Sequence, residues 1–173
     1  MKINVKIKHL SEDAVIPKYA HEYDAGFDLV AAEDVIIEPG ETKIVPTGLA
    51  IALPPGYEAQ IRPRSGITVK TKLRVQLGTV DAGYNGEIGI IVDNIHGGNK
   101  GMTVKRNALD TSGKVIREVD PNHIYGTYII RKGDRLAQIV INQVEQAQFQ
   151  IIEELDETQR GAGGFGSSGV TSE

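Results

Sequence analysis

The 173-residue chain is long enough for one domain that buries about two-thirds of its unfolded surface. It contains no cysteine, which excludes disulfides, thiolate catalysis and cysteine-based zinc sites, and its four histidines lack the His-x-x-x-His spacing of zinc hydrolases. A net charge of −4 argues against a general nucleic-acid surface, and no run of 18 apolar residues could span a membrane. We therefore expect a cytoplasmic globular protein.

Short stretches of alternating or β-branched apolar residues recur along the chain and predict strands. At the start, residues 2–8 alternate in polarity, which predicts a strand and not a signal peptide. The later apolar stretches lie at 35–37, 43–45, 49–51, 59–61, 88–92, 128–130, 139–141 and 149–152. Turn signals such as Pro39-Gly40 separate them, and the best candidate for a helix is confined to about residues 67–73. Many short strands separated by turns predict an all-β sandwich or barrel with one short helix.

A carboxylate and an aromatic ring lie close together in residues 78–87. Asn85-Gly86 is a strong signal for a two-residue type I′ turn, so we expect a β-hairpin here. Three apolar residues should alternate outward along its second strand: Ile88, Ile90 and Val92. Asp81 and Tyr84 would then lie on the rim of a narrow, apolar-walled slot. The alternative is a turn aspartate and a half-buried strand tyrosine without chemistry.

Three further sites carry polar groups that could bind a ligand or an ion. Arg64 offers a planar guanidinium, Ser65 a hydroxyl and Gly66 a backbone N–H that a phosphate can approach. The alternative is an ordinary helix start with Ser65 as the N-cap. Asp28 lies inside an apolar run, where an acid needs a cation, a metal-bound water or an arginine as partner. Gln138 is embedded in a predicted strand, where it could simply face solvent.

Two segments stand apart from this strand pattern. Residues 97–126 are rich in glycine and charge, and we predict a charged hairpin inserted between two core strands, with an idle surface excursion as the alternative. Four apolar residues of the insertion must pack on the body or on another protein: Val104, Leu109, Val115 and Ile116. Residues 160–169 contain five glycines and cannot hold one conformation unaided. This tail is either a disordered end or a segment that orders over a ligand, with Arg160 on an anion and Phe165 on a flat ring.

Five segments, in this order, resemble the five motifs of the trimeric dUTP diphosphatases (dUTPases): residues 25–32, 63–66, 78–87, 133–138 and 160–168. No nucleophile elbow, Walker P-loop or His-Glu-x-x-His motif competes with them. The resemblance implies a jelly-roll-like (β-clip) fold and a homotrimer whose three active sites are each built from all three subunits. It also implies Mg²⁺-dependent hydrolysis of dUTP to dUMP and pyrophosphate. We expect one β domain over residues 1–159, with the insertion at 97–126, followed by a flexible lid over 160–173.

The resemblance also implies roles for single residues. Asp81 would be the general base that orients the attacking water, and it would hold the deoxyribose 3′-OH. Tyr84 would pack under the sugar and exclude ribonucleotides, while Asp28 would bind Mg²⁺ through water. The other implied substrate-binding residues are Arg64, Ser65, Gly66, Val80, Gly86, Ile88, Gly89, Gln138, Arg160, Phe165, Gly166 and Ser167. Within this set the backbone of residues 84–89 would read the uracil edge, and Arg160 and Phe165 would close the site.

Two other functions remain open. A dCTP deaminase has the same broad fold, although the segments at 63–66 and 81–84 suit the diphosphatase better. The insertion resembles the extra segment of some phage-encoded dUTPases of Gram-positive hosts, which can bind repressor proteins. The chain could therefore be a phage regulatory protein that binds a repressor through residues 97–126, with the nucleotide as a switch. In either case we expect the cytoplasm of a bacterium or phage-infected host, without membrane or direct nucleic-acid partners.

Overall fold

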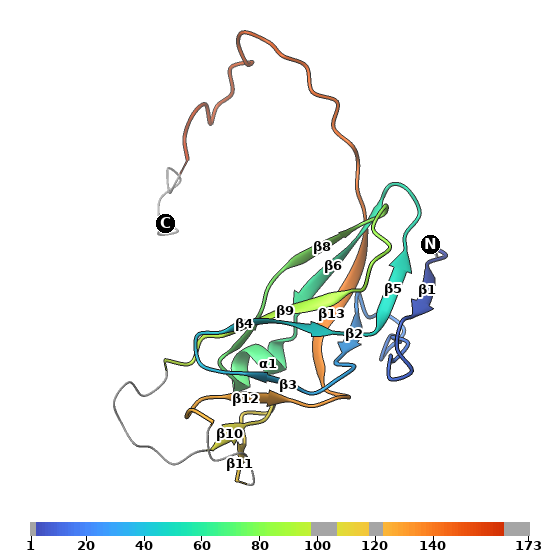
Figure 1. Ribbon diagram of the computed structural model, residues 1–173. Helices are drawn as coiled ribbons and strands as arrows, with labels where there is room; N and C mark the ends of the chain where they lie inside the picture. The colour runs from blue at the N-terminus through green and yellow to red at the C-terminus, as the bar shows by residue number, and fades with distance from the viewer. Residues whose placement is uncertain (1–2, 98–106, 118–122, 165–173) are drawn as a thin grey trace.

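The computed structural model describes residues 3–97, 107–117 and 123–164. These residues form short strands and one helix, α1 (Ser65–Lys70), which confirms the predicted all-β class (Figure 1). The strands in chain order are β1 (Lys6–His9), β2 (Phe27–Val30), β3 (Val35–Ile37), β4 (Thr42–Pro46), β5 (Leu49–Ala52), β6 (Tyr57–Pro63), β7 (Leu73–Val75), β8 (Gly78–Asp81), β9 (Gly89–Asn94), β10 (Ala108–Leu109), β11 (Val115–Ile116), β12 (Tyr128–Ile130) and β13 (Arg135–Gln143).

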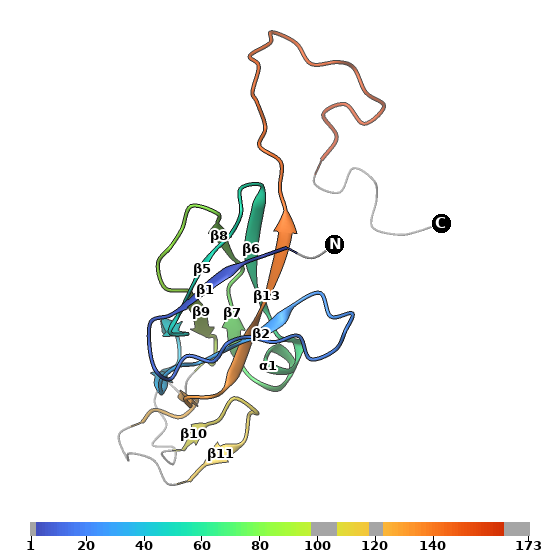
Figure 2. The same cartoon turned by 90° about the vertical axis from the view of Figure 1, so that its right-hand side faces the viewer.

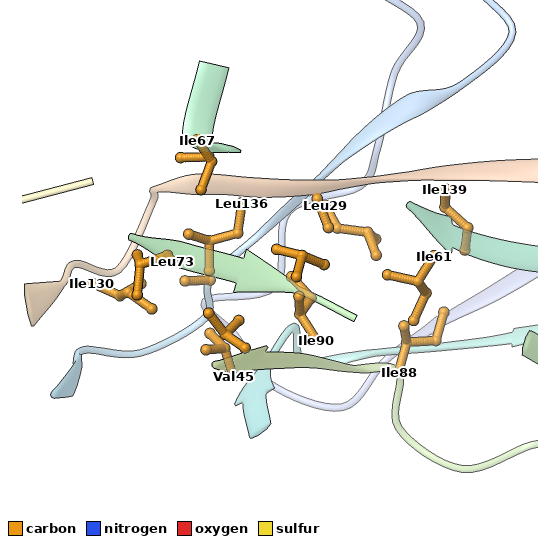
Figure 3. Packing of buried hydrophobic residues seen from close by; sticks show 14 of the residues in the cluster. Leu29, Val45, Ile61, Ile67, Leu73, Ile88, Ile90, Ile130, Leu136 and Ile139 are labelled. Atoms are coloured by element: carbon orange, nitrogen blue, oxygen red, sulfur yellow. The ribbon is translucent and has the colours of Figure 1, made fainter. Parts of the chain in front are cut away.

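Two sheets enclose most of the core. One has the order β2-β13-β6-β8 and the other β4-β9-β7. Side chains alternate along each strand, so that Ala59 and Ile61 of β6 point inward while Glu58, Gln60 and Arg62 point outward. Figure 3 shows the inward residues of the two sheets meeting, with helix α1 and strand β12 closing one end. The result is a jelly-roll-like arrangement, as predicted.

The insertion adds a small hairpin to a third sheet. Strands β10 and β11 pair antiparallel, which confirms the predicted hairpin, and β10 also pairs in parallel with β12 at Leu109 and Tyr128. The resulting sheet has the order β11-β10-β12-β3. Ala108 is fully buried in it. Val104 lies outside the described residues, so its predicted packing stays a prediction.

The predicted hairpin around Asn85-Gly86 is wrong. Strand β8 pairs with β6 and strand β9 pairs with β4 and β7, so the chain crosses from one sheet to the other between Asp81 and Gly89. Gly86 is not among the glycines with positive φ, which a type I′ turn would require. The predicted outward direction of the second strand is also wrong, because three side chains point into the core: Ile88, Ile90 and Val92.

Two other boundaries differ from the expectation. Helix α1 begins at Ser65 and ends at Lys70, earlier than the predicted 67–73, because residues 73–75 form β7 against β9. Residues 149–152 are not a strand in the described chain, since no neighbouring strand offers them a ladder. After β13 the chain leaves the body as an extended arm (Figures 1 and 2). Among the described helices, none is long and apolar enough to cross a membrane.

Candidate active site

An ion-pair cluster lies where β6 runs into α1. Asp28 of β2 forms an ion pair with Arg64, whose Nε lies 2.9 Å from Oδ1, and its Oδ2 accepts a hydrogen bond from Arg135 Nη1 at 3.2 Å. Arg64 Nη1 also donates to the backbone oxygen of Arg135 at 2.9 Å. The partner of Asp28 is therefore an arginine pair, which is one of the three kinds of partner expected from the sequence. The side chain of Asp28 is only 18% exposed, so the two guanidinium groups offset most of the cost of burying its charge.

The start of helix α1 is open beside this cluster. Arg64 is the N-cap in an extended conformation, and no side chain caps the helix, so the alternative of Ser65 as the N-cap is wrong. Ser65 and Gly66 are exposed, and a Cβ at Gly66 would meet nothing within 4 Å. N–H groups in the first turn of a helix lack partners inside the helix. An anion can thus approach these groups from solvent.

Gln138 belongs to the same face of the sheet. It lies on β13 directly opposite Asp28 on β2 and Arg62 on β6, and its side chain is exposed. Residues directly opposite one another in antiparallel strands point to the same side. The end of β6 that runs into α1 therefore gathers the four residues that the sequence predicts at the phosphates: Arg64, Ser65, Gly66 and Gln138.

Asp81 lies at the other end of β6. It ends β8, opposite Glu58, and its backbone oxygen accepts the N–H of Tyr84 at 3.0 Å, which closes a tight turn. Among the described residues, none donates a hydrogen bond or forms an ion pair with the Asp81 carboxylate. Asp81 is on the wall of a hollow of about 620 Å³, together with Pro55, Tyr57 and Glu58. Its carboxylate is accessible to water.

The ring of Tyr84 is fixed although about half of it is exposed. Its hydroxyl donates to the backbone oxygen of Glu87 at 2.9 Å. The ring lies so close to Gly86 that a Cβ there would be 2.4 Å from the Tyr84 Oη. Glycine is required at position 86 for this contact and not for a positive φ.

The segment after Tyr84 is anchored to the body. Glu87 Oε1 accepts the N–H of Gly48 at 2.8 Å, and Ile88 donates its N–H to the Leu49 oxygen at 2.8 Å. The side chains of Val80 and Ile88 are buried in the core, so either residue could meet a ligand only through its backbone. Gly89 is another of the predicted substrate-binding residues, and a Cβ at this position would be 2.4 Å from Ile44 Cγ2. Close packing therefore requires glycine at that position.

The two ends of strand β6, with Asp81 beside one and Arg64 at the other, are far apart within one chain. Asp81 pairs with Glu58, and Arg64 follows Glu58 by six residues along an extended strand. At about 3.3 Å per residue this separates their backbones by about 20 Å. A general base must lie within hydrogen-bond reach of the water that it activates. One chain by itself therefore does not bring Asp81 to the phosphate end.

The arm carries the remaining predicted residues. Arg160 belongs to the arm that follows β13; it is exposed, and its Nε donates to the oxygen of Gly163 at 2.9 Å. Three predicted site residues lie outside the described residues: Phe165, Gly166 and Ser167.

No group of three or more acidic, histidine or cysteine side chains in the described residues could hold a metal ion. A cage made only of protein ligands is therefore not found in this part of the chain. Asp28 is the acidic side chain in this cluster, and each of its oxygens already contacts one guanidinium group. A carboxylate has about four lone-pair positions, so room remains for a hydrogen bond from a metal-bound water.

Comparisons with known proteins identify the family of the chain. A sequence profile of the dUTPase family matches residues 12–108 and 110–169. A deoxyuridine 5′-triphosphate nucleotidohydrolase of Gloeothece citriformis is 41% identical over 173 residues, which is 99% of this chain and 100% of the relative. The dUTPase of Staphylococcus bacteriophage 80alpha, solved with dUpNHpp, has a TM-score of 0.90 and 36% identity, and the match covers 98% of this chain and 100% of that one.

The dUTPase of phage phi11 of S. aureus has a TM-score of 0.84 and 34% identity, with coverage of 90% and 100%. Its structure is described as visualising a species-specific insert, and a mutant of it as showing a structural Mg(II) ion. The 80alpha enzyme is described as one of the phage dUTPases that control transfer of virulence genes. Fold and site together define an all-β protein with a guanidinium cluster at one end of β6 and an exposed carboxylate at the other. The chain belongs to the dUTPase family.

Proposed function

We propose that this chain hydrolyses dUTP to dUMP and pyrophosphate, with Asp81 as the general base for a water that attacks the α-phosphorus. The proposal rests on where two of the family's segments lie. The exposed carboxylate of Asp81, without a partner in the described chain, lies at one end of β6, and the guanidinium cluster around Asp28 lies at the other. A positioned general base contributes about 10²- to 10⁴-fold in rate. Arg64, Ser65, Gly66 and Gln138 would hold the phosphates.

Tyr84 and the two residues after it supply the selectivity in this proposal. The fixed, half-exposed ring of Tyr84 offers a flat surface for a deoxyribose and would leave no space for a 2′-hydroxyl. Among the described residues, the backbone groups of Asn85 and Gly86 make no hydrogen bond, whereas those of Tyr84 and Ile88 do. Asn85 and Gly86 would therefore read the uracil edge.

We further propose that the site is completed in a homotrimer. The separation of about 20 Å between the two ends requires that Asp81 of one copy meets Arg64 of another. The arm would pack on a neighbouring copy, because three of its apolar side chains are each more than four-fifths exposed in one chain: Phe149, Ile151 and Leu155. Its four acidic side chains within residues 153–157 would complement the exposed Lys6 and Lys8 of β1, which pairs only with β5 in the described chain. Light scattering should give three times the chain mass of 18.7 kDa.

Mg²⁺ fits this site as an ion that arrives with the triphosphate. Mg²⁺ commonly keeps several waters and binds through one or two carboxylates plus substrate phosphates. Asp28 would accept hydrogen bonds from its waters while it holds Arg64 and Arg135. When bound, the ion supplies neutralisation of charge on the phosphate oxygens.

The end of the chain would close the site. Arg160 would contact the terminal phosphate, and Phe165, with Gly166 and Ser167, would cover the base, so that residues 160–173 act as a lid after the β domain. The relatives' names place the reaction in nucleotide metabolism, so we expect the protein in the cytoplasm of a bacterium or phage-infected host.

The insertion supports a second role as a partner surface for a repressor-type protein. Its inner strand β10 is docked on β12, but its outer strand β11 has an open edge in the described residues, with Val115 half exposed. Replacing residues 97–126 with a short Gly/Ser link should leave dUTP hydrolysis within a few-fold of the parent and abolish repressor binding in a pull-down from a phage-bearing host. Val115→Asp tests the open edge without removing β10, with the exposed Tyr23→Asp as control. Loss of catalysis in a still-trimeric deletion variant would place the insertion in the active site.

Pyrophosphate release from a panel of nucleoside triphosphates, with and without Mg²⁺, tests the main proposal. We expect release from dUTP with Mg²⁺ and little from dTTP or UTP. Comparable turnover of dTTP or UTP would contradict the roles of Tyr84 and of the 84–89 backbone. Ammonia release from dCTP would instead show a deaminase.

A further inference from the structure

Strand β13 has an irregularity that changes the direction of Arg135. The pairing register with β2 shifts between Arg135 and Ala137, which marks a β-bulge. Residues three apart on a regular strand point to opposite faces, yet Arg135 and Gln138 are both exposed while Leu136 and Ala137 are both fully buried. Bulges occur preferentially next to active sites, where they redirect a side chain. Here the bulge brings Arg135 to the face that carries Asp28 and Gln138.

The guanidinium of Arg135 contacts Asp28, but most of its N–H donors have no acceptor in the described chain. Its side chain is 60% exposed, and it makes one hydrogen bond, to Asp28 at 3.2 Å. An arginine has five N–H donors, so four of them face no acceptor within the described chain. An exposed ion pair of this kind adds little to folding stability. A structural role therefore does not explain why the strand is interrupted to place Arg135 here.

Arg135 and Arg64 form a pair of neighbouring cationic groups. The Arg135 backbone accepts Arg64 Nη1, and Asp28 binds both guanidinium groups, so the three residues are mutually positioned. Two positive charges and one negative charge leave the cluster with a net positive charge. Such an arrangement, with fixed donors and an excess of positive charge, suits a polyphosphate.

We propose that Arg135 is a further substrate-binding residue, which donates hydrogen bonds directly to the phosphate chain beside Arg64. This proposal rests on the proposed function, because it assumes a nucleoside triphosphate at this end of β6. Asp28 then also acts as a positioning residue, because it holds the two guanidinium groups next to one another before the substrate arrives.

Binding of dUpNHpp by the full-length chain with Mg²⁺, measured by calorimetry, tests this proposal. Arg135→Gln should weaken dUpNHpp about tenfold or more, the size expected for a lost charge-assisted hydrogen bond. Competition by deoxyuridine, which has no phosphate, should change less than twofold. The matched control is Arg131→Gln, which removes the same charge four residues earlier, where Arg131 pairs with Asp34 away from the cluster. It should leave both affinities unchanged.

A double variant separates direct contact from an effect through Asp28. In an Asp28→Asn background, Arg135→Gln should still weaken dUpNHpp by at least about threefold. Loss of the effect in that background, or equal weakening of deoxyuridine, would overturn the proposal. If Arg135→Gln lowers Tm markedly, Arg135→Lys keeps the charge but not the planar fork and should still bind dUpNHpp more weakly than the parent. Failure of the parent chain to bind dUpNHpp would contradict the proposed function, whereas equal binding by parent and Arg135→Gln would contradict this inference alone.

Discussion

The two aspartates of the candidate site stand in opposite environments. Asp28 is largely buried, and each of its oxygens forms an ion pair with a guanidinium group. Asp81 is exposed, and among the described residues no side chain or backbone group binds its carboxylate. A carboxylate that contacts two arginines positions those arginines, whereas a carboxylate without such partners has its oxygens free to contact a water. The difference in partners, and not the residue type, separates the structural acid from the candidate base.

Removing the unpartnered acid should have the largest effect. Asp81→Asn keeps the shape of the side chain but removes its capacity to accept the proton, so kcat should fall by about 10²-fold or more. Binding of dUpNHpp should remain close to that of the parent. Near-normal kcat would mean that water is activated elsewhere, and Glu58, directly opposite Asp81, would be the next residue to change.

The second prediction asks whether the tail and the Asp81 that serve one site come from different copies. Deleting residues 160–173 should leave fold and assembly intact, because the arm leaves the body after β13, and should lower kcat/KM at least about tenfold through loss of Arg160. Mixing tail-deleted chains with Asp81→Asn chains should restore part of the activity, measured as pyrophosphate release. Mixed assemblies without any recovery would show that tail and base act only within one copy.

The third prediction disturbs the acid-bearing end without touching either aspartate. Gly86→Ala places a methyl group where the Tyr84 hydroxyl now lies, so the ring must move. We expect KM for dUTP to rise about tenfold, a loss of about 1.4 kcal/mol, and discrimination against UTP to weaken. Gly83→Ala in the same turn is the matched control, because its Cβ would meet nothing within 4 Å. An equal effect of both variants would indicate turn flexibility and not the Tyr84 contact.

The smallest effect concerns a third aspartate, Asp34, which lies outside the ion-pair cluster of Asp28. The N–H of Lys132, together with the Arg131 guanidinium, lowers the pKa of Asp34 below its usual 3.8. A carboxyl whose folded pKa is lowered adds stability above its unfolded pKa, and that stability is lost as the pH falls through the folded value. Asp34→Asn should therefore lower Tm at pH 7, with a difference from the parent that shrinks below about pH 4.

The control for this prediction is Glu33→Gln. Glu33 is the exposed neighbour of Asp34, and no hydrogen bond or ion pair is formed by its side chain within the described residues. Its removal should leave Tm unchanged at both pH values. A constant Tm difference between Asp34→Asn and the parent from pH 7 to pH 3 would show that ionisation of Asp34 does not contribute.

Most strands, the short helix near residue 67 and the inserted hairpin could be predicted from the sequence, because alternation and turn chemistry act within a few residues. The polar character of Asp28, Arg64 and Asp81 was also visible from their neighbours.

The tertiary structure alone decided which strands pair with one another. Asn85-Gly86 signals a hairpin locally, but β8 and β9 find better-fitting neighbours in different sheets, and residues 149–152 have strand composition but no ladder in the described chain. It also decided that Arg135 contacts Asp28, since a bulge places one extra residue of β13 against β2 and so depends on the pairing of two distant strands.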